Sequence, residues 1–172
     1  MRKTIIGVMG PGDTASQKDR ENAFALGKLI ASNGWVLLSG GGCKGAMDAV
    51  NKGAKSANGL TVGILFANDH LDLSEAVDIA IVSGMGSARN NINVLSSDVV
   101  IACGLAAGTA SEICLTLKAE KHVVILNDNE LSKPFFTDLG KDLTHIAKDP
   151  QDAIEQVKRI LASVKEPASA AK

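Results

Sequence analysis

The chain repeats one local construction three times: an apolar run leads into a glycine-rich turn, and the turn leads into a helical pattern. The three turns span residues 40–45, 84–89 and 104–109. The runs before them are apolar at nearly every position, which is typical of strands in a parallel sheet that helices cover on both faces. Because strands alternate with helices, the sequence predicts an α/β fold: a single Rossmann-like domain, doubly wound around a mainly parallel sheet.

Further strands and helices extend the same alternation. A first strand is expected over Thr4–Met9, where Gly10, Pro11 and Gly12 end it. The other expected strands are residues 35–38, 60–66, 77–82, 99–103 and 122–126. The expected helices are residues 16–32, a helix that ends at Asn58, residues 88–95, residues 110–119, and a last helix that begins at Pro150 with Asp149 as its cap. We expect one domain over residues 1–164 and a flexible Ala/Ser/Lys-rich tail over residues 165–172.

The position of the three turns predicts a ligand. All three follow the carboxyl ends of strands, and in an open α/β sheet these ends lie at the edge where ligands bind. Glycine has no Cβ, so backbone N–H groups at the start of a helix lie open to a phosphate or another oxyanion. Three such turns within 172 residues predict a phosphorylated small molecule as the ligand.

The composition argues against other kinds of partner. Aromatic residues make up only 3% of the chain, tyrosine is absent, and the formal net charge is −1. Nucleic-acid binding relies on a basic surface and, for single strands, on aromatic stacking, so we expect no nucleic-acid partner. No secretory signal and no apolar run near ~20 residues is visible, which predicts a cytoplasmic protein without membrane contact. Cys43, Cys103 and Cys114 lack metal-type spacing, so no metal site is expected.

The first glycine turn allows two other interpretations. Gly40, Gly42 and Gly45 fit the G-x-G-x-x-G dinucleotide fingerprint, but the acidic residue expected at the end of the next strand is missing. Phe66 ends that strand, and Asp69 comes three residues too late. This disfavours a nicotinamide cofactor. The glycines could also serve only the packing of a tight strand-to-helix crossing, although packing alone does not explain why three turns share the feature.

Two charged residues stand out beside the turns. Thr109 and Glu112 have the spacing of a capping box, in which each side chain accepts from the other residue's backbone N–H. That structural role for Glu112 competes with a role in chemistry at the ligand. Arg89 follows the second turn, at the expected ligand edge, where a guanidinium can bind phosphate with two hydrogen bonds.

These motifs resemble the superfamily of the cytokinin-activating phosphoribohydrolases, the "lysine decarboxylase-like" proteins. Their G-G-G-x-x-G-x-M turn is matched by residues 40–47, and their P-G-G-x-G-T-x-x-E motif corresponds to residues 104–112. The resemblance implies that the arginine and glutamate of the hydrolases fall on Arg89 and Glu112. However, Asn90 replaces the lysine after the arginine, and Leu105-Ala106-Ala107 replaces the P-G-G start.

The chain is also similar to the molybdenum cofactor carrier and binding proteins of algae and cyanobacteria. Residues 84–90, 93–104 and 108–112 carry this likeness. It implies a homo-oligomer, a dimer or a tetramer, that binds, stores and protects molybdopterin cofactor and passes it to molybdoenzymes without performing a reaction. The alternatives are a phosphoribohydrolase that cleaves nucleoside 5′-monophosphates, with Arg89 and Glu112 as its catalytic residues, and a nucleotide sensor without turnover.

The turns and the resemblance together predict the cofactor-binding residues. The candidates are Gly10, Gly12, Gly40, Gly41, Gly42, Gly45, Met85, Gly86, Arg89, Asn90, Gly104, Gly108, Thr109, Ala110, Ser111 and Glu112.

Overall fold

The computed structural model describes residues 2–127 and 129–165, and within them the chain forms one sheet of seven parallel strands in the order β4-β3-β2-β1-β5-β6-β7. The strands are β1 (Ile5–Met9), β2 (Val36–Ser39), β3 (Thr61–Leu65), β4 (Ile79–Val82), β5 (Val99–Cys103), β6 (Val123–Leu126) and β7 (Thr144–Ile146). The helices are α1 (Gln17–Ser32), α2 (Gly45–Ser56), α3 (Arg89–Ser96), α4 (Ala107–Lys118), α5 (Ser132–Gly140) and α6 (Pro150–Lys165), with single 3₁₀ turns at η1 (Gly86–Ala88) and η2 (Lys141–Leu143).

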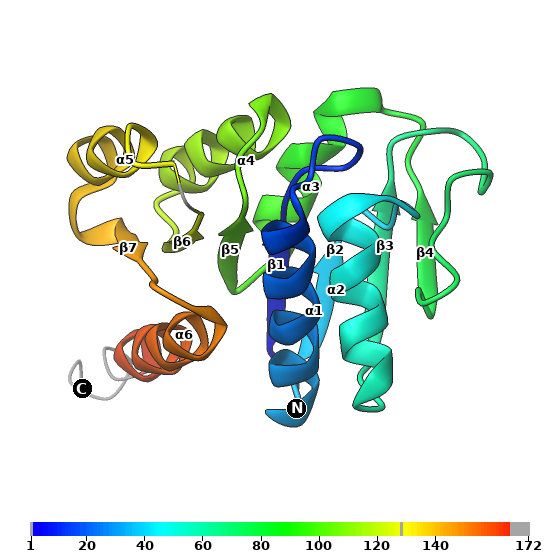
Figure 1. The fold of residues 1–172 in the computed structure, drawn as a ribbon, viewed down its shortest axis with the longest axis horizontal. Coiled ribbons are helices and arrows are strands. Elements are labelled where there is room, and N and C mark those ends of the chain that lie inside the picture. Colours follow the sequence, from blue (N-terminus) through cyan, green and yellow to red (C-terminus); the bar gives the residue numbers. More distant parts are fainter. Residues whose placement is uncertain (1, 128, 166–172) are drawn as a thin grey trace, which may run out of the picture.

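Helices cover both faces of the sheet, as the uniformly apolar strands predict (Figure 1). Side chains point alternately to the two faces along a strand. Val8 and Ile101 face one layer, where they pack with residues of α1, α2 and α6. Met9 and Val100 face the other layer, with residues of α3, α4 and α5. The predicted doubly wound α/β fold is therefore confirmed.

Some predicted boundaries differ from the structure. The second strand begins at Val36 rather than at residue 35, and the fourth begins at Ile79 rather than at residue 77. Sequence reasoning assigned no element between residues 127 and 148, where the structure has α5, η2 and β7. α6 runs to Lys165, and residues 166–172 of the predicted tail lie outside the described residues. No helix of the described residues is long and apolar enough to cross a membrane.

Caps define the ends of two helices. Ser16 caps α1: its Oγ accepts from the Asp19 amide at 3.1 Å, and the Asp19 carboxylate accepts from the Ser16 amide at 2.9 Å. This is a capping box that the sequence analysis did not predict. The predicted cap of α6 is confirmed, because Asp149 Oδ1 accepts from the Asp152 amide at 2.8 Å, next to Pro150.

Two glycines let α1 and α2 approach each other closely. A Cβ added to Gly27 would lie 2.0 Å from the carbonyl oxygen of Val50, and one added to Gly53 would lie 2.0 Å from that of Phe24. Both neighbours are backbone atoms, which cannot swing away as a side chain can. The contact places α1 and α2 side by side over β1 and β2 (Figure 1).

We predict that Gly27→Ala destabilises the protein although alanine favours helix formation. The added methyl must push the two backbones apart, and overpacking of this kind costs about 1–3 kcal/mol. Chemical denaturation of the wild type and the variant measures the change in the free energy of unfolding. Equal or greater stability of the variant would show that the helix contact is looser than described.

Candidate functional site

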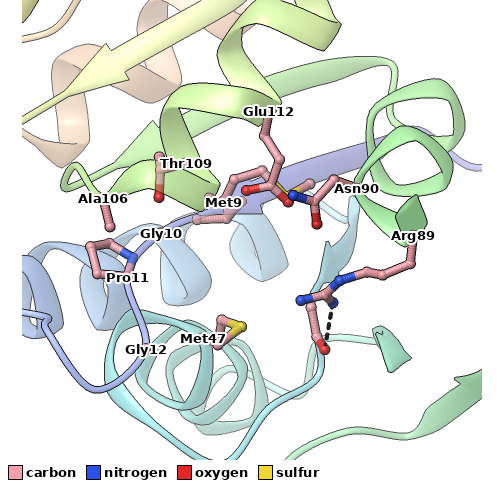
Figure 2. Close-up of a pocket in the computed structure, with 13 residues that line it drawn as sticks. Met9, Gly10, Pro11, Gly12, Met47, Arg89, Asn90, Ala106, Thr109 and Glu112 are labelled. Atoms are coloured by element: carbon pink, nitrogen blue, oxygen red, sulfur yellow. Dashed lines mark hydrogen bonds between the residues drawn. The ribbon is translucent and has the colours of Figure 1, made fainter. Parts of the chain in front are cut away.

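A cavity of about 200 Å³ lies where the chain connections change direction across the sheet. β1 is paired with β2 on one side and with β5 on the other. The chain leaves β1 into α1 on one face and leaves β5 into α4 on the opposite face, so the two turns diverge and leave a crevice. Figure 2 shows the crevice between the turn after β1, the start of α4 and Arg89 of α3.

The structure brings half of the predicted site residues to this cavity. Those that line it are Gly10, Gly12, Gly40, Arg89, Asn90, Gly108, Thr109 and Glu112. Those that do not line it are Gly41, Gly42, Gly45, Met85, Gly86, Gly104, Ala110 and Ser111. Sequence reasoning missed Val8, Met9, Pro11, Met47 and Ala106, which also line it. Pro11 could have been found from its place between two predicted glycines, and Met47 from its place at the end of the G-G-G-x-x-G-x-M motif, whereas nothing in the sequence marks Met9.

The start of α4 is bare. The helix begins at Ala107, three residues earlier than predicted, and its N-cap residue Ala106 offers no side-chain acceptor. The first backbone hydrogen bond runs from the Ala110 amide to the Ala106 carbonyl at 2.8 Å. The amides of Ala107, Gly108 and Thr109 precede that bond and have no acceptor within the helix. They form the kind of positive helix terminus that binds anions.

The predicted capping box between Thr109 and Glu112 is wrong. Because α4 starts at Ala107, Thr109 stands inside the first turn rather than at the cap position. Its side chain is buried, and its Oγ1 has no hydrogen-bond partner among the described residues. The carboxyl group of Glu112 points into the cavity (Figure 2) and accepts from Asn93 Nδ2 at 3.2 Å. Both polar groups are therefore available to a ligand.

In the turn at residues 40–45, two of the amides that were predicted to be open donate to acceptors within the protein. The Gly41 amide donates to Ser39 Oγ at 3.1 Å, and the Cys43 amide donates to the Asp72 carbonyl at 2.8 Å. A Cβ on Gly45, whose φ is +59°, would lie 1.9 Å from the Gly12 carbonyl oxygen. These glycines serve the close packing of the turn, which is the alternative that the sequence left open.

The turn at residues 84–89 is also closed by the protein. The Gly84 amide donates to the Ala67 carbonyl, and the Gly86 amide donates to the Phe66 carbonyl, both at 3.0 Å. Both glycines have positive φ, which shapes the entry into η1 and α3. At the start of α4 none of the amides of Ala107, Gly108 and Thr109 has a described acceptor, whereas at the start of α2 the Ala46 amide donates to the Pro11 carbonyl at 2.9 Å.

Arg89 brings a positive charge to the cavity wall. Its Nη1 donates to the carbonyl of Gly40 at 2.9 Å and to that of Ile64, which ties the guanidinium to the ends of β2 and β3. Its Nε is buried without a partner among the described residues. Burial lowers the pKa of Arg89, and the nearby Glu112 opposes this effect. Nη1 of the guanidinium thus binds backbone carbonyls, while the side chain borders the cavity (Figure 2).

Glu112 is an unusually weak acid for a carboxyl group. Its side chain is only 7% exposed. Burial raises its pKa to about 7, although the Asn93 hydrogen bond and the Arg89 charge favour the ionised form. The cavity therefore holds a carboxyl group that changes its charge near neutral pH.

We predict that Glu112→Gln removes a pH-dependent part of the stability. The folded protein holds the Glu112 proton more tightly than the unfolded chain, whose carboxyl has a pKa of 4.5. Wild type should therefore lose stability relative to the Gln variant as pH rises from 4.5 to about 7. The loss should total on the order of 3 kcal/mol and level off above that window. Urea unfolding of both proteins across this pH range measures it.

Glu75→Gln is the matched control, because Glu75 is exposed and its substitution removes one surface charge. Its stability should follow that of wild type at every pH. Parallel pH profiles for wild type and Glu112→Gln would contradict the raised pKa.

The chain matches the SLOG cluster4 family over residues 3–154. It is similar in structure to the molybdenum cofactor binding protein from the phototrophic bacterium Rippkaea orientalis, with 55% identity, a TM-score of 0.92, and 94% of this chain and 99% of that chain covered. It is also similar to the Moco carrier protein from Chlamydomonas reinhardtii, with 49% identity, a TM-score of 0.88 and the same coverage.

A third similarity is shorter. The chain is 47% identical to the cytokinin riboside 5′-monophosphate phosphoribohydrolase of Mycobacterium marinum over 45 residues. This match covers 26% of this chain and 24% of that protein. The resemblance to molybdenum cofactor carriers, within the superfamily of the phosphoribohydrolases, is thereby confirmed.

Proposed function

The chain belongs to the SLOG cluster4 family, and we propose that it binds molybdenum cofactor as cargo, stores and protects it, and passes it to molybdoenzymes. The observation that carries the proposal is the uncapped start of α4, where Gly108, Arg89 and Thr109 line one cavity and the buried Thr109 Oγ1 has no hydrogen-bond partner among the described residues. The relatives named as cofactor-binding and carrier proteins, which cover almost the whole chain, supply the identity of the ligand.

The anionic groups of the cofactor suit this arrangement. Molybdopterin carries a phosphate, and the start of a helix stabilises an anion by about 0.3–1 kcal/mol at the surface and by more where it is partly buried. Thr109 Oγ1 can donate one further hydrogen bond, and Arg89 adds a full positive charge. The phosphate is expected at the amides of Ala107, Gly108 and Thr109, so one glycine turn takes the role that was predicted for three.

The size of the cavity limits how much of the ligand it encloses. At about 200 Å³ it is smaller than the roughly 300–1,000 Å³ of typical ligand sites. It suits the phosphate and the atoms next to it, and the remainder of the cofactor is expected to extend across the mouth. An open mouth fits a protein that must release its cargo.

A second candidate function rests on the fact that Arg89 and Glu112 line the same cavity. A phosphoribohydrolase needs an arginine to hold the substrate and a carboxyl group to act at the ribose, and a pKa near 7 suits general acid or base catalysis. Release of free adenine from AMP, abolished by Glu112→Gln, would favour this enzyme. We place the carrier first because Asn90 and Leu105-Ala106-Ala107 replace the hydrolase residues.

We also propose that the protein is a cytoplasmic homo-oligomer. β4 is an edge strand, and its Ile79 and Ile81 are 47% and 46% exposed. Their pairing partners Val62 and Ile64 show that both isoleucines lie on the α3 face of the sheet. A second copy that covers this apolar strip would remove it from water and also protect an open sheet edge.

The first test is retention of the cofactor. Purified protein is incubated anaerobically with molybdenum cofactor released from a molybdoenzyme, separated by gel filtration, and assayed for bound pterin and for reconstitution of a cofactor-free molybdoenzyme. We expect bound cofactor that oxidises more slowly than free cofactor and that restores activity. A folded protein that retains none would refute the proposal.

We predict that Gly108→Ala separates binding from stability. No atom lies within 4 Å of the position that its Cβ would take, so the methyl fits the ligand-free protein. Alanine in a helix is favoured over glycine by about 0.8–1 kcal/mol, and the variant should be equally or more stable. Cofactor retention should nevertheless fall at least tenfold, because the methyl stands beside the amides that are expected to hold the phosphate.

Gly27→Ala is the matched control, since it adds the same methyl to a helix glycine that does not line the cavity. It should lose stability but keep its affinity for the cofactor. Full retention by Gly108→Ala would show that the ligand does not approach the start of α4.

A further inference from the structure

Glu112 has a further role in this cavity that rests on the proposed function. An acid is an unexpected neighbour for an anion site. Its carboxyl group points into the same cavity as the start of α4 (Figure 2), one helical turn after Thr109. Its only side-chain hydrogen bond among the described residues is the one that Asn93 donates to Oε1. An ionised Glu112 would repel the phosphate that α4 attracts.

The surroundings of Glu112 provide little compensation for a negative charge. Met9 from β1, Asn90 and Asn93 from α3, and Thr109 from α4 itself carry no charge. Arg89, from α3, is the one charged group that acts on Glu112 among the described residues. Its Nη1 is occupied by two backbone carbonyls, and the two side chains form no salt bridge.

The charges change when the ligand enters. A single guanidinium then faces two negative groups, the phosphate and the Glu112 carboxylate, and among the described residues no second cation lines the cavity. Like charges in a buried site favour the protonation of one of them. Glu112 already ionises near neutrality in the ligand-free protein, so it accepts the proton at small cost. Once protonated, the group turns from a repelling anion into a hydrogen-bond donor.

We propose that Glu112 couples cofactor binding to the uptake of one proton. The proton comes from solvent and adds to a Glu112 carboxylate oxygen; the resulting O–H donates to an oxygen of the anionic group, and no other bond forms or breaks. The affinity for the cofactor falls as pH rises above neutrality, because the proton becomes harder to supply. Glu112 is thus a pH-sensitive element of the binding site rather than a catalytic residue.

The coupling has a measurable size. At pH 8 about nine tenths of the Glu112 groups in the free protein are ionised, since burial raises their pKa to about 7. Binding must then reverse that ionisation, and the affinity drops about tenfold for each further pH unit. A glutamine at this position is neutral at every pH and should bind about tenfold more tightly than wild type at pH 8. The difference should close toward pH 6.

The experiment is anaerobic titration calorimetry of the cofactor into wild type, Glu112→Gln and the surface control Glu75→Gln. Each titration is run at pH 6, 7 and 8, in pairs of buffers with different ionisation enthalpies, which reveals the number of protons bound. Wild type and Glu75→Gln should take up close to one proton more than Glu112→Gln at pH 8. Subtraction of the Glu112→Gln values removes the titration of the cofactor's own phosphate.

The possible outcomes separate the two proposals. Binding by wild type with the same proton count and the same pH slope as Glu112→Gln overturns the coupling but leaves the cofactor site standing. A folded Glu112→Gln that loses binding also overturns it, since the ionised carboxylate would then be required. Absence of binding by wild type at every pH refutes the proposed function, and the coupling falls with it.

A second measurement covers the case in which Glu112→Gln does not fold. Infrared difference spectra of wild type at pH 8, with and without cofactor, should show a protonated carboxyl band that appears on binding. A merely structural role for Glu112 would leave that band unchanged, and its absence would overturn the coupling.

Discussion

The close approach of three backbone segments at the end of β1 determines where the site can form. A Cβ on Gly10 would lie 2.5 Å from the Cys103 carbonyl oxygen, and one on Gly45 would lie 1.9 Å from that of Gly12. The Ala46 amide also donates to the Pro11 carbonyl at 2.9 Å. The turn after β1 is thereby fixed between the end of β5 and the start of α2. Side chains larger than hydrogen at these points would force the segments apart and open the wall of the cavity.

The glycine turns show what sequence reasoning could and could not provide. The uniformly apolar strands were sufficient to predict the parallel sheet and the helices on both faces, because burial on both sides leaves no room for alternation. The glycines marked the correct edge of the sheet. They did not reveal that Ser39 and Asp72 accept from Gly41 and Cys43, since the hydrogen bond to Asp72 depends on a loop about thirty residues away. The glycines also did not reveal that α4 starts as early as Ala107, because that start depends on the extended backbone conformation of Ala106.

Glycines within the α-helices of this chain therefore have two different roles. At Gly27, Gly45 and Gly53 the missing Cβ makes room for another segment of the protein. At Gly108 the space remains open in the ligand-free protein. Glycine content alone cannot distinguish these cases, because both require only that a side chain be absent. The surroundings of the Cβ position distinguish them, and only the open case points to a ligand.

The balance of charge in the cavity separates this chain from the hydrolases that it resembles. The lysine that follows the arginine in the hydrolase motif is Asn90 here, and its Nδ2 donates to Ser111 Oγ of α4 at 3.2 Å. Asn90 thus joins α3 to α4 instead of adding a second cation. With Arg89 as the one charged partner of Glu112 among the described residues, the ionised pair is neutral overall. A neutral site attracts an anion more strongly once it takes up a proton. A site with a second cation would be positively charged, and would attract the anion, without that proton. The replacement of one lysine therefore connects two features of the structure, the raised pKa of Glu112 and the hydrogen bond between α3 and α4, with the proposed dependence of anion binding on pH.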